Sequence, residues 1–221
     1  MSSQSSLDAA SIRGVIFDCD GVMIDSAVAN TMFYNRIREY FGLPPMTREQ
    51  ERYTMMATAR QAMEYVTPEE LHPELDRICR EEVIYRRDIM PLITLMPGFL
   101  DFAAWLYEQG IALAIHTNRI QRGIDHVLQT FAIPPYFKPI MTAELAAPKP
   151  SPEGVHAIQK AWGYDARAML FVGDSPLDKA AAEAAGVPFA AFGSLGLAGD
   201  ICAPNYTVLQ QAVRPLLAAK Q

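Results

Sequence analysis

The sequence of this 221-residue chain predicts an α/β fold with a three-layer α/β/α core, a mostly parallel sheet and a small α-helical domain. Short apolar stretches typical of buried strands alternate with helical patterns over most of the chain, as in a parallel sheet covered by helices on both faces. Residues 26–93 instead show helical patterns and no convincing strand. Ligands of such sheets bind beyond the carboxyl ends of the strands, so the residues that follow the predicted strands form the candidate site.

The predicted strands are short apolar runs bounded by glycine, proline or polar residues. They comprise residues 14–17, 111–116, 139–142, 168–172 and 187–192. Helical patterns occupy residues 99–109, 120–131, 152–162 and 177–185, between and beside the later strands. This order predicts that crossover helices join the strands, which therefore run parallel.

The helical segment interrupts the core between its first strand and its first crossover helix. We expect helices at residues 28–41, 48–66 and 68–88, separated by the Gly-Leu-Pro-Pro run at 42–45 and by Thr-Pro at 67–68. The expected boundaries are residues 1–25 and 94–221 for the core and residues 26–93 for the inserted domain. The insertion holds nine arginines and no lysine. Met55, Met56 and Met63 could form a soft lid surface, or they could pack in an ordinary core.

Composition restricts the class of partner. The net charge is −6 and the pI is about 5.2, which disfavours nucleic acid or an anionic membrane as a partner. Residues 1–10 are polar and lack the features of a signal peptide, and no apolar run is long enough to span a bilayer. Three cysteines without a Cys-x-x-Cys spacing fit free thiols in a reducing compartment. We therefore expect a cytoplasmic protein, and a monomer.

The most informative run is residues 15–26, in which the first apolar strand ends in Asp18, Asp20 and Gly21. Side chains two residues apart in an extended backbone leave the same face, so the two carboxylates are expected to converge. A hard cation such as Mg²⁺ would relieve their repulsion and leave a carboxylate oxygen free to attack phosphorus. The alternative is a strand followed by an Asx turn, in which Gly21 supplies the tight bend.

A second polar run, Thr117-Asn118-Arg119, follows the strand predicted at 111–116. A hydroxyl at the carboxyl end of a strand, followed by the backbone amides of a turn, can donate to a phosphate oxygen. The alternative is that Thr117 is only the N-cap of the next helix.

Lys149 lies between Pro148 and Pro150, which restrict the backbone on both sides. An ammonium fixed in this way could neutralise the aspartates and a transferring phosphoryl group. The alternative is a rigid loop whose lysine points to water.

The last candidate motif follows the strand predicted at 168–172 and contains Gly173, Asp174, Ser175 and Asp178. Asp174 is expected at the sheet edge beside Asp18, and Asp178, one helical turn later, could support a metal site or pair with Lys149. Helix capping by Asp174 or Ser175 is compatible with both roles.

These four motifs resemble the haloacid dehalogenase superfamily, in the subgroup whose helical cap is inserted after the first strand. That subgroup includes phosphoglycolate-phosphatase-like and β-phosphoglucomutase-like proteins. The motifs at 18–21, 117, 149 and 174–178 follow the order of the family, and the resemblance covers nearly the whole chain. The cap is matched in position and helical character more than in sequence. The resemblance implies a Rossmann-like core with an α-helical cap domain.

The resemblance also implies roles for the site residues. Asp18 would be the nucleophile that forms an aspartyl phosphate, and Asp20 would be the general acid and base. The dehalogenases that name the superfamily lack the second aspartate, so phosphoryl transfer is implied here. Mg²⁺ would be held by Asp18, the backbone carbonyl of Asp20 and Asp174, with Asp178 in support. The residues implied to bind the phosphoryl oxygens are Gly21, Thr117, Asn118 and Lys149.

The expected function is that of a Mg²⁺-dependent phosphatase of a small phosphorylated metabolite, most similar to the phosphoglycolate-phosphatase-like branch. The cap would select the substrate and exclude water. Arg60 is the candidate for a substrate contact from the cap, because it lies in mid-helix beside small residues. The alternative is that Arg60 is exposed to solvent.

The sequence disfavours three other functions. Phosphonate hydrolysis through a Schiff base needs a lysine from the cap, which residues 26–93 lack. The β-phosphoglucomutase-like mutases carry a histidine where this chain has Asn30, and they also use a cap lysine, so a mutase is disfavoured. A non-catalytic phosphoryl-binding or regulatory module would be favoured if a catalytic carboxylate were missing, but none is.

Overall fold

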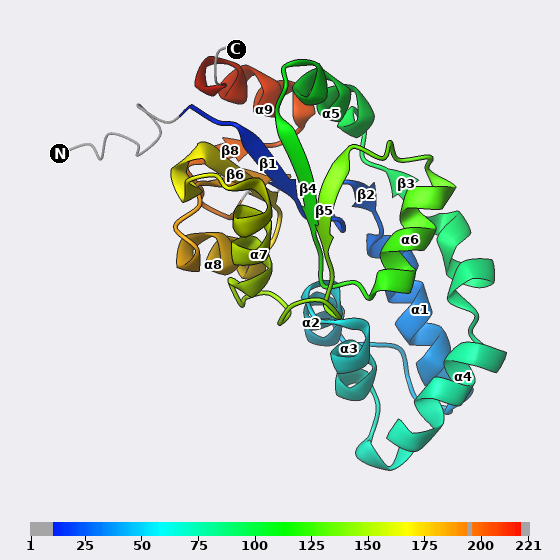
Figure 1. Cartoon of the computed structure of the whole chain (residues 1–221). Coiled ribbons are helices and arrows are strands. Elements are labelled where there is room, and N and C mark those ends of the chain that lie inside the picture. Colours follow the sequence, from blue (N-terminus) through cyan, green and yellow to red (C-terminus); the bar gives the residue numbers. More distant parts are fainter. Residues whose placement is uncertain (1–10, 194–195, 218–221) are drawn as a thin grey trace.

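The computed structural model describes residues 11–193 and 196–217 and shows a six-stranded sheet with helices on both faces (Figure 1). In spatial order the strands are β5 (Phe137–Met141), β4 (Ala112–His116), β1 (Gly14–Phe17), β6 (Met169–Gly173), β7 (Phe189–Phe192) and β8 (Ile201–Ala203). Each neighbouring pair in this order is parallel. The predicted fold class is confirmed.

Strand β1 lies inside the sheet and is buried along its whole length. Its side chains alternate between the two faces, so that Phe17 belongs to the larger core cluster and Ile16 to the smaller one. Phe17 packs edge-on against Phe99, Phe102 and Phe137, with ring centroids 5.7, 6.1 and 6.0 Å away. This packing fixes the strand whose carboxyl end carries the first candidate residues.

The helices form the two outer layers. The face with the larger core cluster is covered by α5 (Phe99–Glu108), α6 (Gln121–Thr130) and α9 (Tyr206–Val213). The opposite face is covered by α7 (Glu153–Trp162) and α8 (Pro176–Ala184). Each helix buries its apolar side against the sheet, which leaves the carboxyl ends of the strands open for polar residues.

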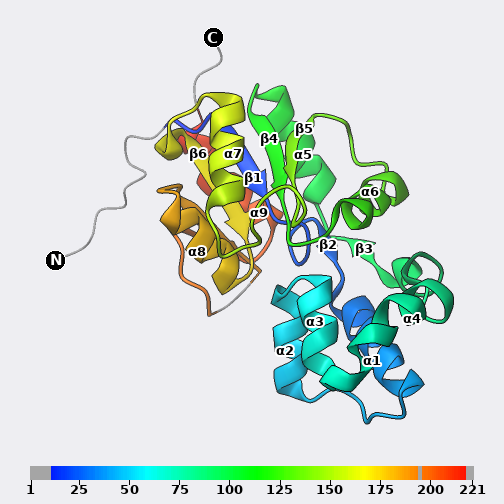
Figure 2. The ribbon, with the colours of Figure 1, turned by 60° about the horizontal axis from the view of Figure 1, so that its bottom comes forward.

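The helical insertion, residues 26–93, leaves and rejoins the core through a short antiparallel ribbon. The ribbon pairs β2 (Ile24–Asp25) with β3 (Thr94–Leu95). Its helices are α1 (Ala27–Tyr40), α2 (Arg48–Met56), α3 (Ala59–Val66) and α4 (Leu75–Glu81). Figure 2 shows them gathered at one end of the sheet, so the insertion faces the edge where the candidate residues lie.

Two of the three predicted insertion helices are wrong in extent. The helix expected at residues 48–66 is divided into α2 and α3, because Thr58 caps a new helix. Gln61 donates its backbone N–H to the Thr58 hydroxyl at 3.4 Å, and its side-chain oxygen accepts the Thr58 N–H at 3.1 Å. The helix expected at residues 68–88 is divided into a 3₁₀ segment (Glu69–Glu74), α4 and one π turn (Tyr85–Ile89), and Pro73 lies inside the 3₁₀ segment.

Other elements escaped prediction. Strand β5 begins at Phe137, two residues before the expected start. The ribbon β2–β3, strand β8 and helix α9 were not predicted. None of the helices in residues 11–193 and 196–217 has both the length and the apolar character needed to cross a membrane. Residues 1–10, on which the expectation of no signal peptide rests, lie outside the described residues.

Candidate active site

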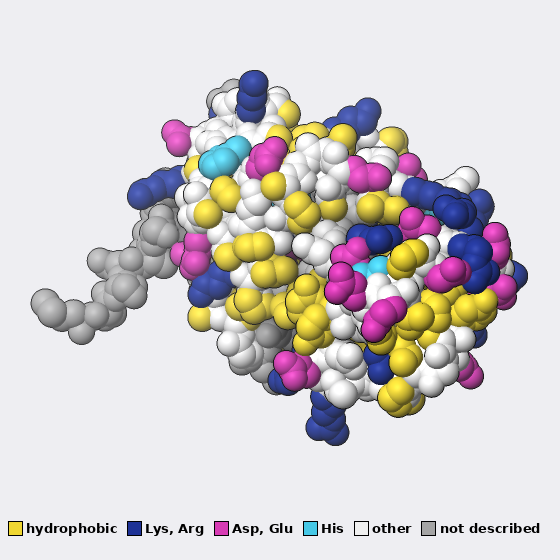
Figure 3. Space-filling model, turned by 90° about the horizontal axis from the view of Figure 1, so that it is seen from below, with side chains coloured by type: hydrophobic (Ala, Val, Ile, Leu, Met, Phe, Trp, Pro, Cys, Tyr) yellow, Lys and Arg dark blue, Asp and Glu magenta, His cyan; other side chains and the backbone are white. Residues whose placement is uncertain are grey.

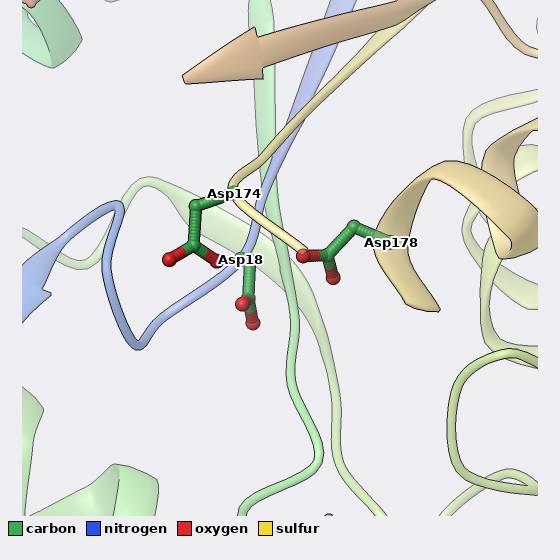
Figure 4. Close-up of side chains that lie close together, drawn as sticks. All are labelled: Asp18, Asp174 and Asp178. Carbon is green, nitrogen blue, oxygen red and sulfur yellow. The ribbon is translucent and has the colours of Figure 1, made fainter. Parts of the chain in front are cut away.

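Asp18 and Asp174 lie side by side because they follow neighbouring parallel strands. Strands β1 and β6 are paired with Phe17 opposite Val172, and the Asp18 backbone N–H donates to the Val172 carbonyl at 3.0 Å. Figure 4 shows their carboxylates converging with that of Asp178, which comes from α8. One carboxylate oxygen from each of the three residues lies within 4.8 Å of the others.

Lys149 lies among these carboxylates and does not point to water. Its ammonium group is 2.7 Å from Asp18 Oδ1 and 2.5 Å from Asp178 Oδ1, and only 4% of the side chain is exposed. It also donates to the His116 carbonyl at 3.3 Å. The proline-restricted loop thus holds a cation against the candidate nucleophile.

Asp178 pairs with Lys149, which is one of the two roles expected of it, and it also takes part in the cap of α8. One carboxylate oxygen pairs with Lys149, while the other accepts the Ser175 N–H at 3.0 Å and the Ser175 hydroxyl at 2.6 Å. In return the Ser175 hydroxyl accepts the Asp178 N–H at 3.2 Å, which completes the cap of α8. Asp178 is fully buried, so it acts as a fixed anchor for the lysine.

The crowding of acids shifts their protonation. Burial raises the pKa of Asp18 well above its usual value, and the Asp178 carboxylate adds to this effect while Lys149 opposes it. Burial, together with Asp178, raises the pKa of Asp174 to about 7. Burial alone would lower the pKa of Lys149, but Asp178 and Asp18 outweigh it and raise the pKa. The site therefore has more negative charge than Lys149 can compensate.

The carboxylate cluster fits a hard divalent cation. Its donors are oxygens, and Asp18 and Asp174 repel each other in the metal-free protein. Asp178 is occupied by Lys149 and Ser175, so Asp18 and Asp174 are the side chains that would hold the ion. Gly21 leaves the necessary space, because a Cβ atom at this position would lie 1.9 Å from Asp174 Oδ2.

Asp20 is held by a residue that the sequence analysis did not single out. Arg119 donates to both of its carboxylate oxygens, from Nε at 2.8 Å and from Nη2 at 2.6 Å, and the Ser26 hydroxyl donates to Oδ1. Burial would raise the pKa of Asp20, but the charge and hydrogen bonds of Arg119 and the Ser26 bond lower it overall. Arg119 also donates to the Tyr85 hydroxyl of the insertion at 2.9 Å.

Thr117 is not the N-cap of the next helix, since Ile120 occupies the N-cap position of α6. Its buried side chain lines the cavity beside Asp18, and its hydroxyl accepts the Arg119 N–H at 3.1 Å. Thr117 therefore lines the same cavity as Asp18.

Two of the predicted phosphate ligands, Asn118 and Gly21, make hydrogen bonds within the protein. The Asn118 side chain accepts the Lys149 N–H at 2.8 Å and donates to the Lys149 carbonyl at 3.3 Å and the Met56 carbonyl at 3.1 Å. Its polar atoms are thus committed to holding the lysine loop and the insertion together. The Gly21 N–H donates to the Ile24 carbonyl at 2.8 Å, so it does not offer a donor to phosphate.

Comparison with known protein families identifies the family of this chain. A family model described as "Haloacid dehalogenase-like hydrolase" matches residues 15–192. The chain belongs to this family. The resemblance inferred from the motifs and the assignment as a hydrolase are confirmed, and the site lies within the matched residues of this haloacid dehalogenase-like hydrolase.

Three relatives illustrate the similarity. "Phosphoglycolate phosphatase 1" of Pseudomonas aeruginosa is 31% identical over 188 residues, which cover 81% of this chain and 68% of the relative. A phosphoglycolate phosphatase of Pseudomonas putida is 29% identical, with 79% and 67% covered. The crystal structure of a HAD-superfamily hydrolase, subfamily IA, variant 1, from Geobacter sulfurreducens has a TM-score of 0.73 at 35% identity, covering 96% of this chain and 99% of that chain.

In this hydrolase a cavity of about 590 Å³ lies between the core and the insertion. The candidate residues Asp18, Asp20 and Asp174 line it on the core side. From the insertion, Met55, Met56 and Met63 line it, which supports the soft lid surface, although Met63 is also 92% buried in the core cluster. Figure 3 views the molecule from this end and shows acidic and basic side chains interspersed, without a broad basic surface on that face.

Arg60, the candidate cap contact, is not among the described residues that line this cavity. Its side chain is 49% exposed and pairs with Glu64 at 2.5 Å and Asp76 at 3.1 Å on the surface of the insertion. The arginines of the insertion that do line the cavity are Arg80 and Arg86. Arg60 therefore faces solvent, as the alternative interpretation predicts, and the prediction of a substrate contact is wrong.

Proposed function

We propose that this protein is a Mg²⁺-dependent phosphatase that hydrolyses a small phosphorylated metabolite through an aspartyl phosphate on Asp18. The observation that carries the proposal is the buried ion pair between Lys149 and Asp18 at 2.7 Å, beside Asp174 and anchored by Asp178. It combines a nucleophile, a fixed cation and oxygen ligands for a metal in one small volume.

In the first step, a carboxylate oxygen of Asp18 attacks phosphorus, and the bond from phosphorus to the ester oxygen breaks. Asp20 first takes up a proton, against the effect of Arg119 and Ser26, which lower its pKa, and then gives this proton to the departing alkoxide, which leaves as an alcohol. Lys149 and the Thr117 hydroxyl face the phosphoryl oxygens and orient them. Lys149 offsets the charge that gathers there in the transition state.

In the second step, a water oxygen attacks phosphorus, and the bond between phosphorus and Asp18 breaks. Asp20, now ionised, accepts the proton of the water. The products are inorganic phosphate and a free Asp18 carboxylate, with Asp20 protonated again for the next cycle. Two moderate displacements thereby replace one difficult displacement by water.

The residues that would hold Mg²⁺ are Asp18, Asp174 and, through its backbone carbonyl, Asp20. When bound, the ion would neutralise the carboxylate cluster and draw negative charge from the phosphoryl oxygens. The support for this set is that burial, together with the neighbouring carboxylates, raises the pKa of both Asp18 and Asp174 in the metal-free protein.

We also propose that residues 26–93 act as a cap that closes the cavity over the substrate. The insertion contributes part of the cavity wall. The polypeptide enters and leaves the insertion through the β2–β3 ribbon. The named relatives are phosphoglycolate phosphatases, which supports a small phosphorylated acid as substrate. The unpaired cysteines, Cys19, Cys79 and Cys202, support the cytoplasm as its location, and we take the monomer as the working state.

The test is phosphate release from a panel of small phosphate esters, with and without Mg²⁺, by the wild-type protein and by Asp18→Asn. Release that requires both Mg²⁺ and Asp18 supports the proposal. Release by Asp18→Asn at a rate near that of the wild type overturns the assignment of the nucleophile. A folded wild-type protein that releases no phosphate from any ester overturns the phosphatase and favours a mutase or a phosphoryl-binding module.

A further inference from the structure

One oxygen of the Asp20 carboxylate is available for proton transfer while its ion pair with Arg119 is intact. Oδ1 accepts from Arg119 Nη2 at 2.6 Å and from the Ser26 hydroxyl. Among the described residues, Oδ2 accepts only from Arg119 Nε, at 2.8 Å. A carboxylate oxygen has two lone pairs, so Oδ2 retains one of them. Because Asp20 lines the cavity and 20% of its side chain is exposed, Oδ2 is the oxygen that can exchange a proton with the substrate or with water.

The direction of this free lone pair is set by Arg119. Its guanidinium holds both carboxylate oxygens of Asp20, and a contact at two points fixes the plane of the carboxylate. A general acid or base must lie within hydrogen-bond distance of the proton that it moves. A displacement of about 1 Å can slow such a reaction by about a hundredfold. The rate of proton transfer through Asp20 therefore depends on where the guanidinium lies.

Tyr85 of the insertion holds the remaining end of the same guanidinium. Its hydroxyl accepts a hydrogen bond from Arg119 Nη1 at 2.9 Å, and the guanidinium carbon lies 5.8 Å from the centre of its ring. Tyr85 begins the π turn Tyr85–Ile89, and its ring packs edge-on against Phe33 of α1, with the ring centroids 5.4 Å apart. The guanidinium is thus clamped between Asp20 of the core and a tyrosine whose position is fixed by the insertion.

We propose that Tyr85 is a positioning residue for proton transfer and that it acts on Asp20 through Arg119. This inference rests on the proposed phosphatase function and adds a residue of the insertion to the groups that control its acid and base. Without the Tyr85 hydroxyl, the guanidinium keeps both bonds to Asp20 but loses the bond that prevents the joined pair from shifting. The insertion thus contributes to the chemical steps as well as to the wall of the cavity.

The two steps of the reaction separate this role from a general effect on the fold. An alkyl phosphate needs a proton from Asp20 when the alkoxide leaves, and it needs Asp20 again to accept the proton of the attacking water. 4-Nitrophenyl phosphate needs only the second transfer, because nitrophenolate leaves without a proton. Loss of positioning therefore slows both steps with an alkyl ester. With the nitrophenyl ester it slows only the hydrolysis of the aspartyl phosphate.

The test is Tyr85→Phe, which removes the hydroxyl and keeps the ring, studied by rapid mixing with each ester in the presence of Mg²⁺. For 2-phosphoglycolate, an alkyl ester, we expect kcat/KM to fall by roughly tenfold. For 4-nitrophenyl phosphate, phosphorylation of Asp18 stays within about twofold of the wild type, while hydrolysis of the intermediate slows by roughly tenfold and the burst of nitrophenolate grows. An equal fall in the first-step rates of both esters would mean that Tyr85 only holds the insertion in place. That result overturns the inference, as does a variant with wild-type rates throughout.

The matched control is Tyr34→Phe, because Tyr34 also lines the cavity from the insertion but its hydroxyl bonds to none of the described residues. Its rates stay within about twofold of the wild type, and the pattern expected of Tyr85→Phe in this control would overturn the inference. Tyr85→Phe added to Arg119→Lys, which lacks the fork, has little further effect, because both changes act on one contact. A full effect in this double variant would show that Tyr85 does not act through Arg119. Asp18-dependent turnover by the wild type upholds the phosphatase in every case, so the two proposals fail separately.

Discussion

The ammonium group of Lys149 lies 2.7 Å from Asp18 Oδ1, and both side chains are almost completely buried. The same ammonium lies 2.5 Å from the fully buried Asp178. Lys149 is thus the cation that allows several carboxylates to share one end of the sheet before any metal binds. This dependence makes the lysine a structural as well as a chemical element of the site.

Lys149→Met is expected to destabilise the metal-free protein by about 3–5 kcal/mol at neutral pH, because it leaves the buried carboxylates of Asp18 and Asp178 without the cation that pairs with them. The loss shrinks as the pH falls, since protonation of Asp18, whose pKa is raised by burial, removes its repulsion with Asp178. Chemical denaturation at two pH values measures it. The control is Lys160→Met, which removes an exposed lysine on α7 and should change stability by less than about 0.5 kcal/mol. Equal effects of the two substitutions would contradict this account of Lys149.

Gly21→Ala is expected to weaken Mg²⁺ binding by displacing Asp174. The added Cβ atom would lie 1.9 Å from Asp174 Oδ2, and the glycine has a φ of +74°. Gly42 has a similar φ of +69°, but none of the described atoms lies within 4 Å of a Cβ placed there. Both substitutions carry a backbone cost of about 1–2 kcal/mol.

Calorimetric titration with Mg²⁺ separates the two effects of these glycines. Only Gly21→Ala should lose affinity, while Gly42→Ala should bind the ion as the wild type does. If both variants bind Mg²⁺ normally, Asp174 is not the ligand that Gly21 makes room for.

Mg²⁺ binding is expected to weaken below neutral pH. The pKa of Asp174 in the metal-free protein is about 7, so its carboxyl group must lose a proton before it can hold the ion. Affinity should therefore fall about tenfold per pH unit below that value and level off above it. The Mg²⁺-induced shift of the melting temperature, measured from pH 5 to 8, follows this change, and Asp174→Asn should show little shift at any pH.

The same pKa has a consequence for the stability of the metal-free protein. A carboxyl group whose pKa is raised on folding stabilises the native state only while it is protonated. The contribution of Asp174 is therefore complete below its ordinary value of 3.8 and is lost as the pH rises to about 7. Denaturation of Asp174→Asn without metal should lack this part of the pH dependence; an unchanged profile would show that another group is responsible.

Much of the site could be predicted because it depends on strand ends. Asp18, Thr117 and Asp174 each follow an apolar strand, and parallel strands bring their carboxyl ends to one edge of the sheet. The two prolines beside Lys149 marked a constrained loop. Local sequence was sufficient for these residues because the backbone topology alone places them together.

The remaining features depend on contacts between distant side chains. Arg119 pairs with Asp20 across 99 residues of sequence, and no local pattern reveals that partner. The small neighbours of Arg60 suggest a cavity residue or a solvent-exposed one, and Glu64 and Asp76 hold it at the surface. The break before α3, by contrast, is marked in the sequence, because Thr58 and Gln61 have the spacing of a capping box.

The short elements were missed for a different reason. Strand β8 contains three residues, of which Cys202 is exposed, and it is held by pairing with β7. Such a strand carries too little periodicity to be recognised, and it forms because the edge of β7 offers it partners.

The central claim, a phosphoryl group carried by Asp18, is tested most directly with Asp20→Asn and 4-nitrophenyl phosphate in the presence of Mg²⁺. Nitrophenolate leaves without a proton, so the first step proceeds without Asp20, whereas hydrolysis of the intermediate lacks its base. We predict a rapid burst of one nitrophenolate per protein molecule, and acid quenching followed by mass spectrometry should find the phosphoryl group on the peptide that contains Asp18. Turnover by the wild type, with neither a burst nor a modified Asp18 peptide in the variant, would contradict the account.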